Sequence, residues 1–80
     1  MGYHKTKIVK GVLGDPSKIQ EELDELRDAD AQGNKILAHC ELADIYGALE
    51  AVARKRGLTM ADLATMAHAT EEAFLEGERE

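Results

Sequence analysis

The sequence is poor in the residues that build a rigid core or a covalent framework. It has no tryptophan, one phenylalanine, two tyrosines, one proline and one cysteine. Because aromatic mass is so scarce in 80 residues, the core must come from aliphatic side chains and from further copies of the chain. The single Cys40 excludes an intrachain disulfide, and its helical position predicts a small buried apolar residue in a reducing compartment.

Long apolar runs and excess positive charge are also missing. No apolar run approaches the roughly 20 residues of a membrane span, and the N-terminus lacks the apolar core of a signal peptide, which predicts a cytoplasmic protein without membrane contact. A formal charge of −6 argues against general nucleic-acid binding. The N-terminal stretch runs against this negative charge, because it contains Lys5, Lys7 and Lys10. It is either a solvated arm or an arm that closes over an anionic substrate.

Capping residues predict an all-α fold with three helices. Residues 1–14 are punctuated by glycine and follow neither helical nor strand periodicity, so we expect an N-terminal arm or loop there. Asp15 and Pro16 predict the start of a first helix that runs to Gln32. The second is expected from Lys35 to Arg56.

The third helix is expected to follow Thr59, which forms a capping box with Asp62, and to end near Gly77. These elements predict one domain over residues 15–77 and a charged tail over residues 78–80. Three amphipathic helices bury too little surface alone, so we expect the protomer to assemble into a helical-bundle oligomer, a dimer or a tetramer.

Acidic residues recur at one-turn spacing on the first two helices. At about 100° per residue, Glu41 lies near the centre of an apolar arc of the second helix and Asp44 on its flank. On the first helix, Glu22 and Glu25 border the apolar face, whereas Glu21 is directed further away. A crossing of the two helices would bring the four better-directed carboxylates together. Such an all-oxygen set suits Mg²⁺, with Mn²⁺ as the alternative.

A metal ion is not the only partner that would suit these carboxylates. A buried, ionised Glu41 needs compensation, and a Lys or Arg of another subunit can serve as well as a cation. A run such as Glu21-Glu22-Leu23-Asp24-Glu25 alone is typical of a solvated helix face. His39 projects from the side of the second helix opposite Glu41, so we expect none of the His-containing ligand sets of zinc or di-iron bundles.

The two acidic segments also resemble known motifs. Glu21-Glu22-Leu23-Asp24-Glu25 and Glu41-Leu42-Ala43-Asp44 resemble the E-E-x-x-E and E-x-x-D motifs of the MazG-like, all-α nucleotide pyrophosphohydrolases. Ser17-Lys18-Ile19 and the loop from Gly11 to Gly14 resemble the small, often phage-encoded, members of that family. The resemblance covers residues 10–52, with the motifs in order on successive helices.

This resemblance implies Mg²⁺-dependent hydrolysis of a nucleoside triphosphate to the monophosphate and pyrophosphate, in a site built by an obligate oligomer. It implies that Glu22, Glu25, Glu41 and Asp44 bind the metal and form the catalytic centre. Glu21 matches the motif and would orient water or act as general base. Lys18, one turn before Glu22, is expected to contact phosphate, and Lys10 to close over the triphosphate. The alternative is a non-catalytic helical protein-interaction module, whose acidic cluster is a structural cation site or is neutralised by a partner.

Overall fold

The described part of the chain folds into three helices joined by short connections. The computed structural model describes residues 4–75, the side chains of residues 73 and 74 excepted. Over that range the elements are α1 (Pro16–Gln32), α2 (Lys35–Lys55) and α3 (Met60–Leu75), with no strand. The all-α prediction is confirmed. The predicted helix end at Gly77 and the tail at residues 78–80 lie outside the described residues.

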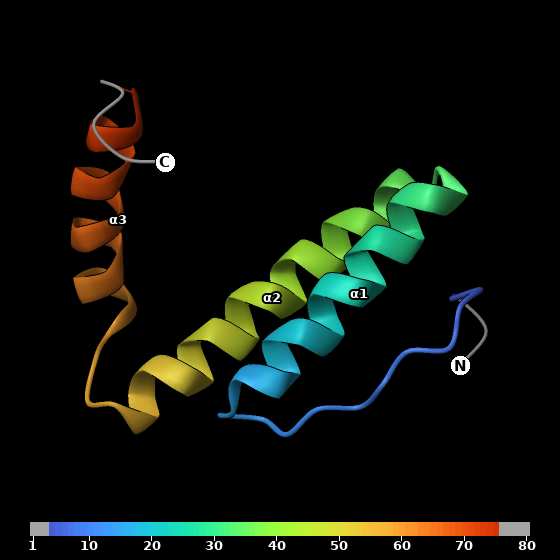
Figure 1. The fold of residues 1–80 in the computed structure, drawn as a ribbon, viewed down its shortest axis with the longest axis horizontal. Helices are drawn as coiled ribbons and strands as arrows, with labels where there is room; N and C mark the ends of the chain where they lie inside the picture. Colours follow the sequence, from blue (N-terminus) through green and yellow to red (C-terminus); the bar gives the residue numbers. More distant parts are fainter. Residues whose placement is uncertain (1–3, 76–80) are drawn as a thin grey trace.

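The helices α1 and α2 lie side by side in antiparallel directions, and α3 stands across the far end of α2 (Figure 1). No helix within residues 4–75 combines the length and the apolar character needed to cross a membrane. Because α1 and α2 form the main interhelical contact, side chains on their facing surfaces determine what the fold brings together.

Local capping accounts for the bounds of α1 and for the start of α2. The Asp15 carboxylate accepts a hydrogen bond from the backbone N–H of Ser17 at 2.9 Å, and proline occupies the first turn. Gly33 ends α1 in the left-handed conformation, with φ 71°. Asn34 then caps α2 by accepting a hydrogen bond from the N–H of Leu37 at 3.0 Å. The predicted bounds of the first helix are therefore confirmed.

The end of α2 and the start of α3 follow the same logic. Arg56 is the C-cap of α2 rather than part of it, and Gly57 has φ 76°. The Thr59 hydroxyl accepts from the N–H of Asp62 at 3.0 Å, and the Asp62 carboxylate accepts from the N–H of Thr59 at 2.9 Å. The capping box predicted from the sequence is confirmed.

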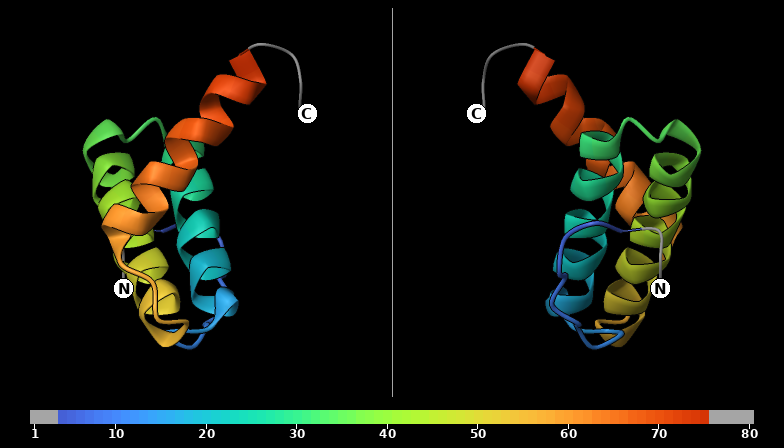
Figure 2. Two further views of the ribbon diagram at one scale, coloured as in Figure 1. Left: turned by 90° about the vertical axis from the view of Figure 1, so that its left-hand side faces the viewer. Right: turned by 90° about the vertical axis from the view of Figure 1, so that its right-hand side faces the viewer.

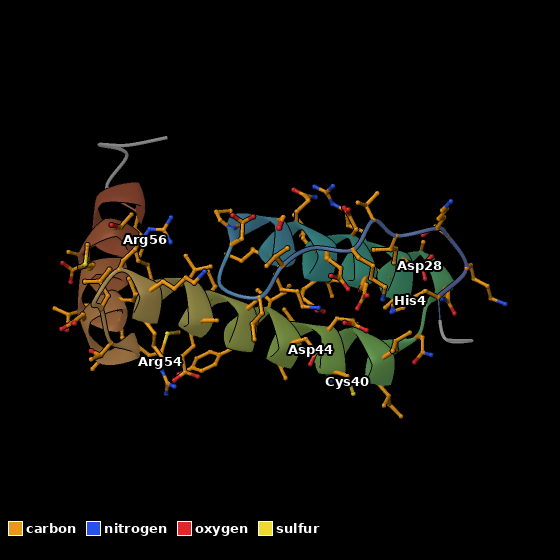
Figure 3. The ribbon with its side chains drawn as sticks, turned by 90° about the horizontal axis from the view of Figure 1, so that it is seen from below. His4, Asp28, Cys40, Asp44, Arg54 and Arg56 are labelled. Atoms are coloured by element: carbon orange, nitrogen blue, oxygen red, sulfur yellow. The ribbon has the colours of Figure 1, made fainter. Side chains whose placement is uncertain are left out.

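Among the described residues, as many carboxylates as apolar side chains are buried. Every buried apolar residue among the described ones is an alanine: Ala29, Ala38, Ala48 and Ala53. The buried charged residues are Glu21, Glu22, Asp28 and Glu41. Larger aliphatic residues, such as Leu23 and Ile45, stay partly exposed. Cys40 is exposed and lies on the side of α2 away from α1 (Figure 3), so the prediction of a buried cysteine is wrong. Successive residues of a helix are about 100° apart, which separates Cys40 from its buried neighbour Glu41.

Residues 4–14 run back along α1 in the opposite direction. The backbone N–H of Gly11 donates to Glu21 at 2.8 Å, and further along the segment the N–H of Lys5 donates to Asp28 at 2.9 Å. In the right-hand view of Figure 2 the segment passes in front of α1. A Cβ at Gly11 would overlap the backbone carbonyl of Ser17, so the approach requires glycine at this position.

Candidate metal centre

Four carboxylates from α1 and α2 converge between the two helices. One oxygen from each of Glu22, Glu25, Glu41 and Asp44 lies within 4.8 Å of the others. Each helix contributes two of them at a spacing of three residues, which places both on one face. The four residues that the sequence predicted as metal ligands are therefore neighbours in the fold.

The cluster is buried on one side and open on the other. Glu22 and Glu41 are only 6% and 4% exposed. Glu25 is partly exposed and Asp44 is exposed. A ligand can therefore approach from the Asp44 side, while the inner carboxylates are withdrawn from water.

Two oxygens in the buried part lack a hydrogen-bond partner among residues 4–75. They are Oε1 of Glu22 and Oε1 of Glu41, both from side chains more than nine-tenths buried. Leaving a buried polar atom unpaired costs about 1–3 kcal/mol, and more for a charged group. Carboxylate oxygens held without partners inside an acidic cluster are suited to a divalent cation, so the residues present fit one.

The acidic environment also changes the protonation of the cluster. Burial raises the pKa of Glu22, Glu25 and Glu41 above the ordinary value of 4.5, because desolvation penalises the ionised form. Repulsion between neighbours acts in the same direction, from Glu41 on Glu25 and from Asp44 on Glu41. Nearby basic groups offset only part of this effect. A bound cation would oppose this upward shift by supplying positive charge beside the carboxylates.

The structure directs Glu21 away from the other four carboxylates. Its Oε1 accepts from the N–H of Gly11 at 2.8 Å and from Nζ of Lys18 at 3.1 Å. The Gly11 hydrogen bond lowers the pKa of Glu21, against the effect of burial. Lys18 Nζ also lies 3.2 Å from Glu22 Oε2, and the 85% exposed Lys10 lies 3.7 Å from Glu21. Glu21 thus connects the N-terminal segment to the lysines instead of joining the cluster.

His4 reaches the cluster from the N-terminal segment. Its Nε2 lies 3.0 Å from Oε2 of Glu41 and 3.7 Å from Oε1 of Glu25. These three residues form a second group whose ligand atoms lie within 4.8 Å of one another. The prediction that excluded the His-containing ligand sets of zinc or di-iron bundles did not foresee this group. That prediction considered His39, which is exposed on α2. A helical wheel gives the direction of residues within a helix, so it says nothing about His4, which lies in an extended segment.

Asp28 holds His4 in place from the other side of the ring. Its Oδ2 lies 2.9 Å from His4 Nδ1 and accepts from the N–H of Lys5 and from Nε2 of Gln32. Its Oδ1 accepts from the N–H and the hydroxyl of Thr6. Although burial opposes the shift, these donors hold the pKa of Asp28 far below its usual range. Figure 3 shows His4 beside Asp28.

His4 faces carboxylate oxygens with both ring nitrogens. An imidazole that donates from both nitrogens is the protonated cation. Burial lowers the pKa of His4, but the hydrogen bonds to Asp28 and Glu41 and the charge of Glu25 raise it further, so the net shift is upward. In the absence of other cations, His4 and Lys18 therefore neutralise part of the acidic charge.

No family model, curated protein or solved structure matches the chain. Its function is therefore inferred from the residues of this site and from their geometry.

Asp28 could have been found from the sequence, whereas His4 could not. Glu21, Glu25 and Asp28 follow one another at helical spacing, so Asp28 falls on the face that carries Glu25, one turn later. No periodicity relates His4 to Asp28, which is 24 residues away in sequence. Only the return of residues 4–14 along α1 brings it to the carboxylates.

Proposed function

We propose that the chain is a divalent-cation-dependent nucleotide pyrophosphohydrolase, with Mg²⁺ or Mn²⁺ held by Glu22, Glu25, Glu41 and Asp44. One observation carries the proposal: four carboxylates converge from two helices, and two of their buried oxygens have no partner within the described part of the chain. A purely structural cluster would gain nothing from orphaned, desolvated oxygens, whereas a hard cation uses them as ligands.

The resemblance of the two acidic motifs supports the substrate class. It suggests a nucleoside triphosphate, in canonical, deoxy or modified form, that is cleaved between the α and β phosphates by water to give the monophosphate and pyrophosphate. When bound, the cation would neutralise phosphate oxygens and position or acidify the attacking water.

The chain's own residues would divide the work around the cluster. The exposed Asp44 marks the open side from which a triphosphate can enter. Lys18 is partly exposed, and its ammonium stands at the edge of the buried carboxylates, where it can contact a phosphate oxygen. Lys10 is exposed enough to do the same from the N-terminal segment. Glu21 holds Lys18, so we assign it to positioning rather than to proton abstraction.

Self-association is part of the proposal. The buried apolar side chains of the described residues are four alanines, which is a small core for three helices. Tyr46, Leu49, Met60 and Leu63 line an apolar hollow shared by α2 and α3, and Tyr46 is 57% exposed. Further copies of the chain, as a dimer or tetramer, would cover this surface.

A specific observation also favours the alternative, a non-catalytic interaction module. His4 and Lys18 already contact Glu41 and Glu22, so basic side chains neutralise part of the cluster without a metal. In that case the carboxylates would serve to attach the N-terminal segment to α1 and α2, and the exposed apolar surface would bind another protein.

Product analysis separates the two functions. The purified protein is incubated with a panel of nucleoside triphosphates in Mg²⁺, in Mn²⁺ and in EDTA, and phosphate products are identified by phosphorus NMR. We expect pyrophosphate and monophosphate in the presence of metal only, with full activity in Glu50→Gln, a control on the same helix outside the cluster. Orthophosphate as first product would contradict attack at the α-phosphorus, and turnover in EDTA would contradict the metal centre.

A further inference from the structure

The imidazole of His4 lies beside a second set of ligand atoms that shares two residues with the first. The four-carboxylate group contains Glu22, Glu25, Glu41 and Asp44, and the other group contains His4, Glu25 and Glu41. We propose that His4, Glu25 and Glu41 form a second cation position, adjacent to the four-carboxylate position, that takes a divalent transition-metal ion such as Mn²⁺. This inference rests on the metal centre of the proposed function.

Glu41 has the arrangement of a bridging ligand. Its Oε2 lies 3.0 Å from His4 Nε2, whereas its Oε1 is buried and has no hydrogen-bond partner among the described residues. The two oxygens of one carboxylate therefore have different neighbours. One is available to an ion beside His4, and the other to an ion within the four-carboxylate group.

Asp28 orients His4 as a metal-binding histidine is usually oriented. With Nδ1–H donated to the buried carboxylate of Asp28 at 2.9 Å, Nε2 is directed at Glu41 and Glu25, where a bound ion would replace its proton. Asp28 is itself fixed by donors from Lys5 and Thr6, so the ring cannot easily turn away. Binding of an ion at Nε2 would release the proton of that nitrogen to solvent.

Charge balance favours two cations over one. The four clustered carboxylates and Asp28 beside them carry five negative charges when ionised, and one divalent ion together with protonated His4 and Lys18 leaves one of these charges uncancelled. Lys18 contacts Glu22, which is not a member of the group that contains His4. A second divalent ion at His4, Glu25 and Glu41, which takes the place of the His4 proton, would complete the neutralisation.

The nitrogen ligand determines which ion is preferred at this position. Carboxylates alone suit Mg²⁺, whereas imidazole nitrogen favours first-row transition ions. A centre with one all-oxygen position and one mixed position would therefore hold Mn²⁺ in both, and Mg²⁺ mainly in the first. A Mg²⁺-loaded protein should bind additional Mn²⁺ at His4.

The test uses Mn²⁺ alone as the probe. Bound Mn²⁺ is counted by equilibrium dialysis, and nitrogen coordination is detected by electron spin-echo envelope modulation, which reports ¹⁴N directly bound to Mn²⁺. We expect two ions per chain and a ¹⁴N signal in the parent, with loss of one ion and of the signal in His4→Gln. The control His39→Gln replaces an exposed histidine outside the centre and should behave as the parent.

A second variant keeps the test available if His4→Gln fails to fold. The double change His39→Gln with His68→Gln leaves His4 as the one imidazole of the sequence, so a ¹⁴N imidazole signal in that protein comes from His4. Absence of the signal there, its persistence in folded His4→Gln, or one ion in both parent and His4→Gln would overturn the second position.

The outcomes also separate this inference from the proposed function. Mg²⁺-dependent release of pyrophosphate with a single, nitrogen-free Mn²⁺ would retain the enzyme and exclude the His4 position. Two bound Mn²⁺ ions without hydrolysis of any nucleotide would retain the position and exclude the enzyme.

Discussion

Replacing Glu41 by glutamine removes one charge from the most buried part of the cluster while keeping the shape of the side chain. The parent carboxylate is 4% exposed, leaves Oε1 unpaired among the described residues and is repelled by Glu25 and Asp44. Its contact with His4 at 3.0 Å is the favourable contribution that opposes these costs. The balance of these terms determines the stability of the metal-free variant.

The magnitudes indicate that these terms nearly cancel without metal. A hydrogen bond to a charged partner contributes about 1.5–3 kcal/mol, and the glutamine oxygen retains part of it by accepting from His4. Relief of a buried, unpaired oxygen returns about 1–3 kcal/mol. We expect the free energy of unfolding in EDTA to change by less than about 1 kcal/mol, which corresponds to roughly 4–8 °C in melting temperature for a chain of this size.

Metal separates the parent from the variant. At a concentration one hundred times its dissociation constant, a cation stabilises the parent by about 2.7 kcal/mol, or roughly 10–20 °C. The variant should lose most of this increase together with hydrolysis, since Glu41 belongs to both groups of ligand atoms.

Thermal melts of both proteins in EDTA and in excess Mg²⁺ measure each quantity. Glu50→Gln is the matched control, because Glu50 lies on the same helix and pairs with Arg54 instead. A loss of more than about 2 kcal/mol in EDTA would show that the carboxylate is a structural partner of a basic group. Equal stabilisation of parent and Glu41→Gln by Mg²⁺ would refute the metal assignment.

The same structure makes three further predictions. In EDTA the melting temperature should fall from pH 5 to pH 8. Folding raises the pKa of His4 above 6.5 and the pKa of the clustered glutamates above 4.5. The stability that these groups contribute is complete at low pH and is lost as the pH rises through their folded pKa values. A melting temperature that rises over this range would contradict the shifts. Gly11→Ala should cost about 1–3 kcal/mol by chemical denaturation, because a Cβ there meets backbone at the start of α1, whereas Gly47→Ala has open space within a helix and should gain about 0.5–1 kcal/mol. A neutral Gly11→Ala would show that the segment docks differently. Light scattering should give the mass of a dimer or a larger oligomer at micromolar concentration. The double variant Tyr46→Lys with Met66→Lys should have a smaller mass, since both side chains are exposed. A monomeric parent would exclude a site built from several subunits.

The sequence alone determined the helices and the acidic set, because both depend on local chemistry. Asp15 with Pro16 and Thr59 with Asp62 hydrogen-bond within a few residues, so their patterns predict helix starts wherever the chain folds. Likewise, a spacing of three residues puts both carboxylates of a helix on one face before any partner is known.

Tertiary structure decided what surrounds those carboxylates. Residues 4–14 fold back along α1, and this return brings His4 between Asp28 and Glu41 and directs Glu21 toward Gly11. These contacts span 10 to 37 residues and come from a segment without periodicity, so no local preference encodes them. The composition of the buried interior was decided in the same way: alanines let α1 and α2 approach, and the larger aliphatic side chains remain at the edges of the contact. Spacing along a helix gives the direction of a side chain, but only the packing of distant segments determines which group it meets.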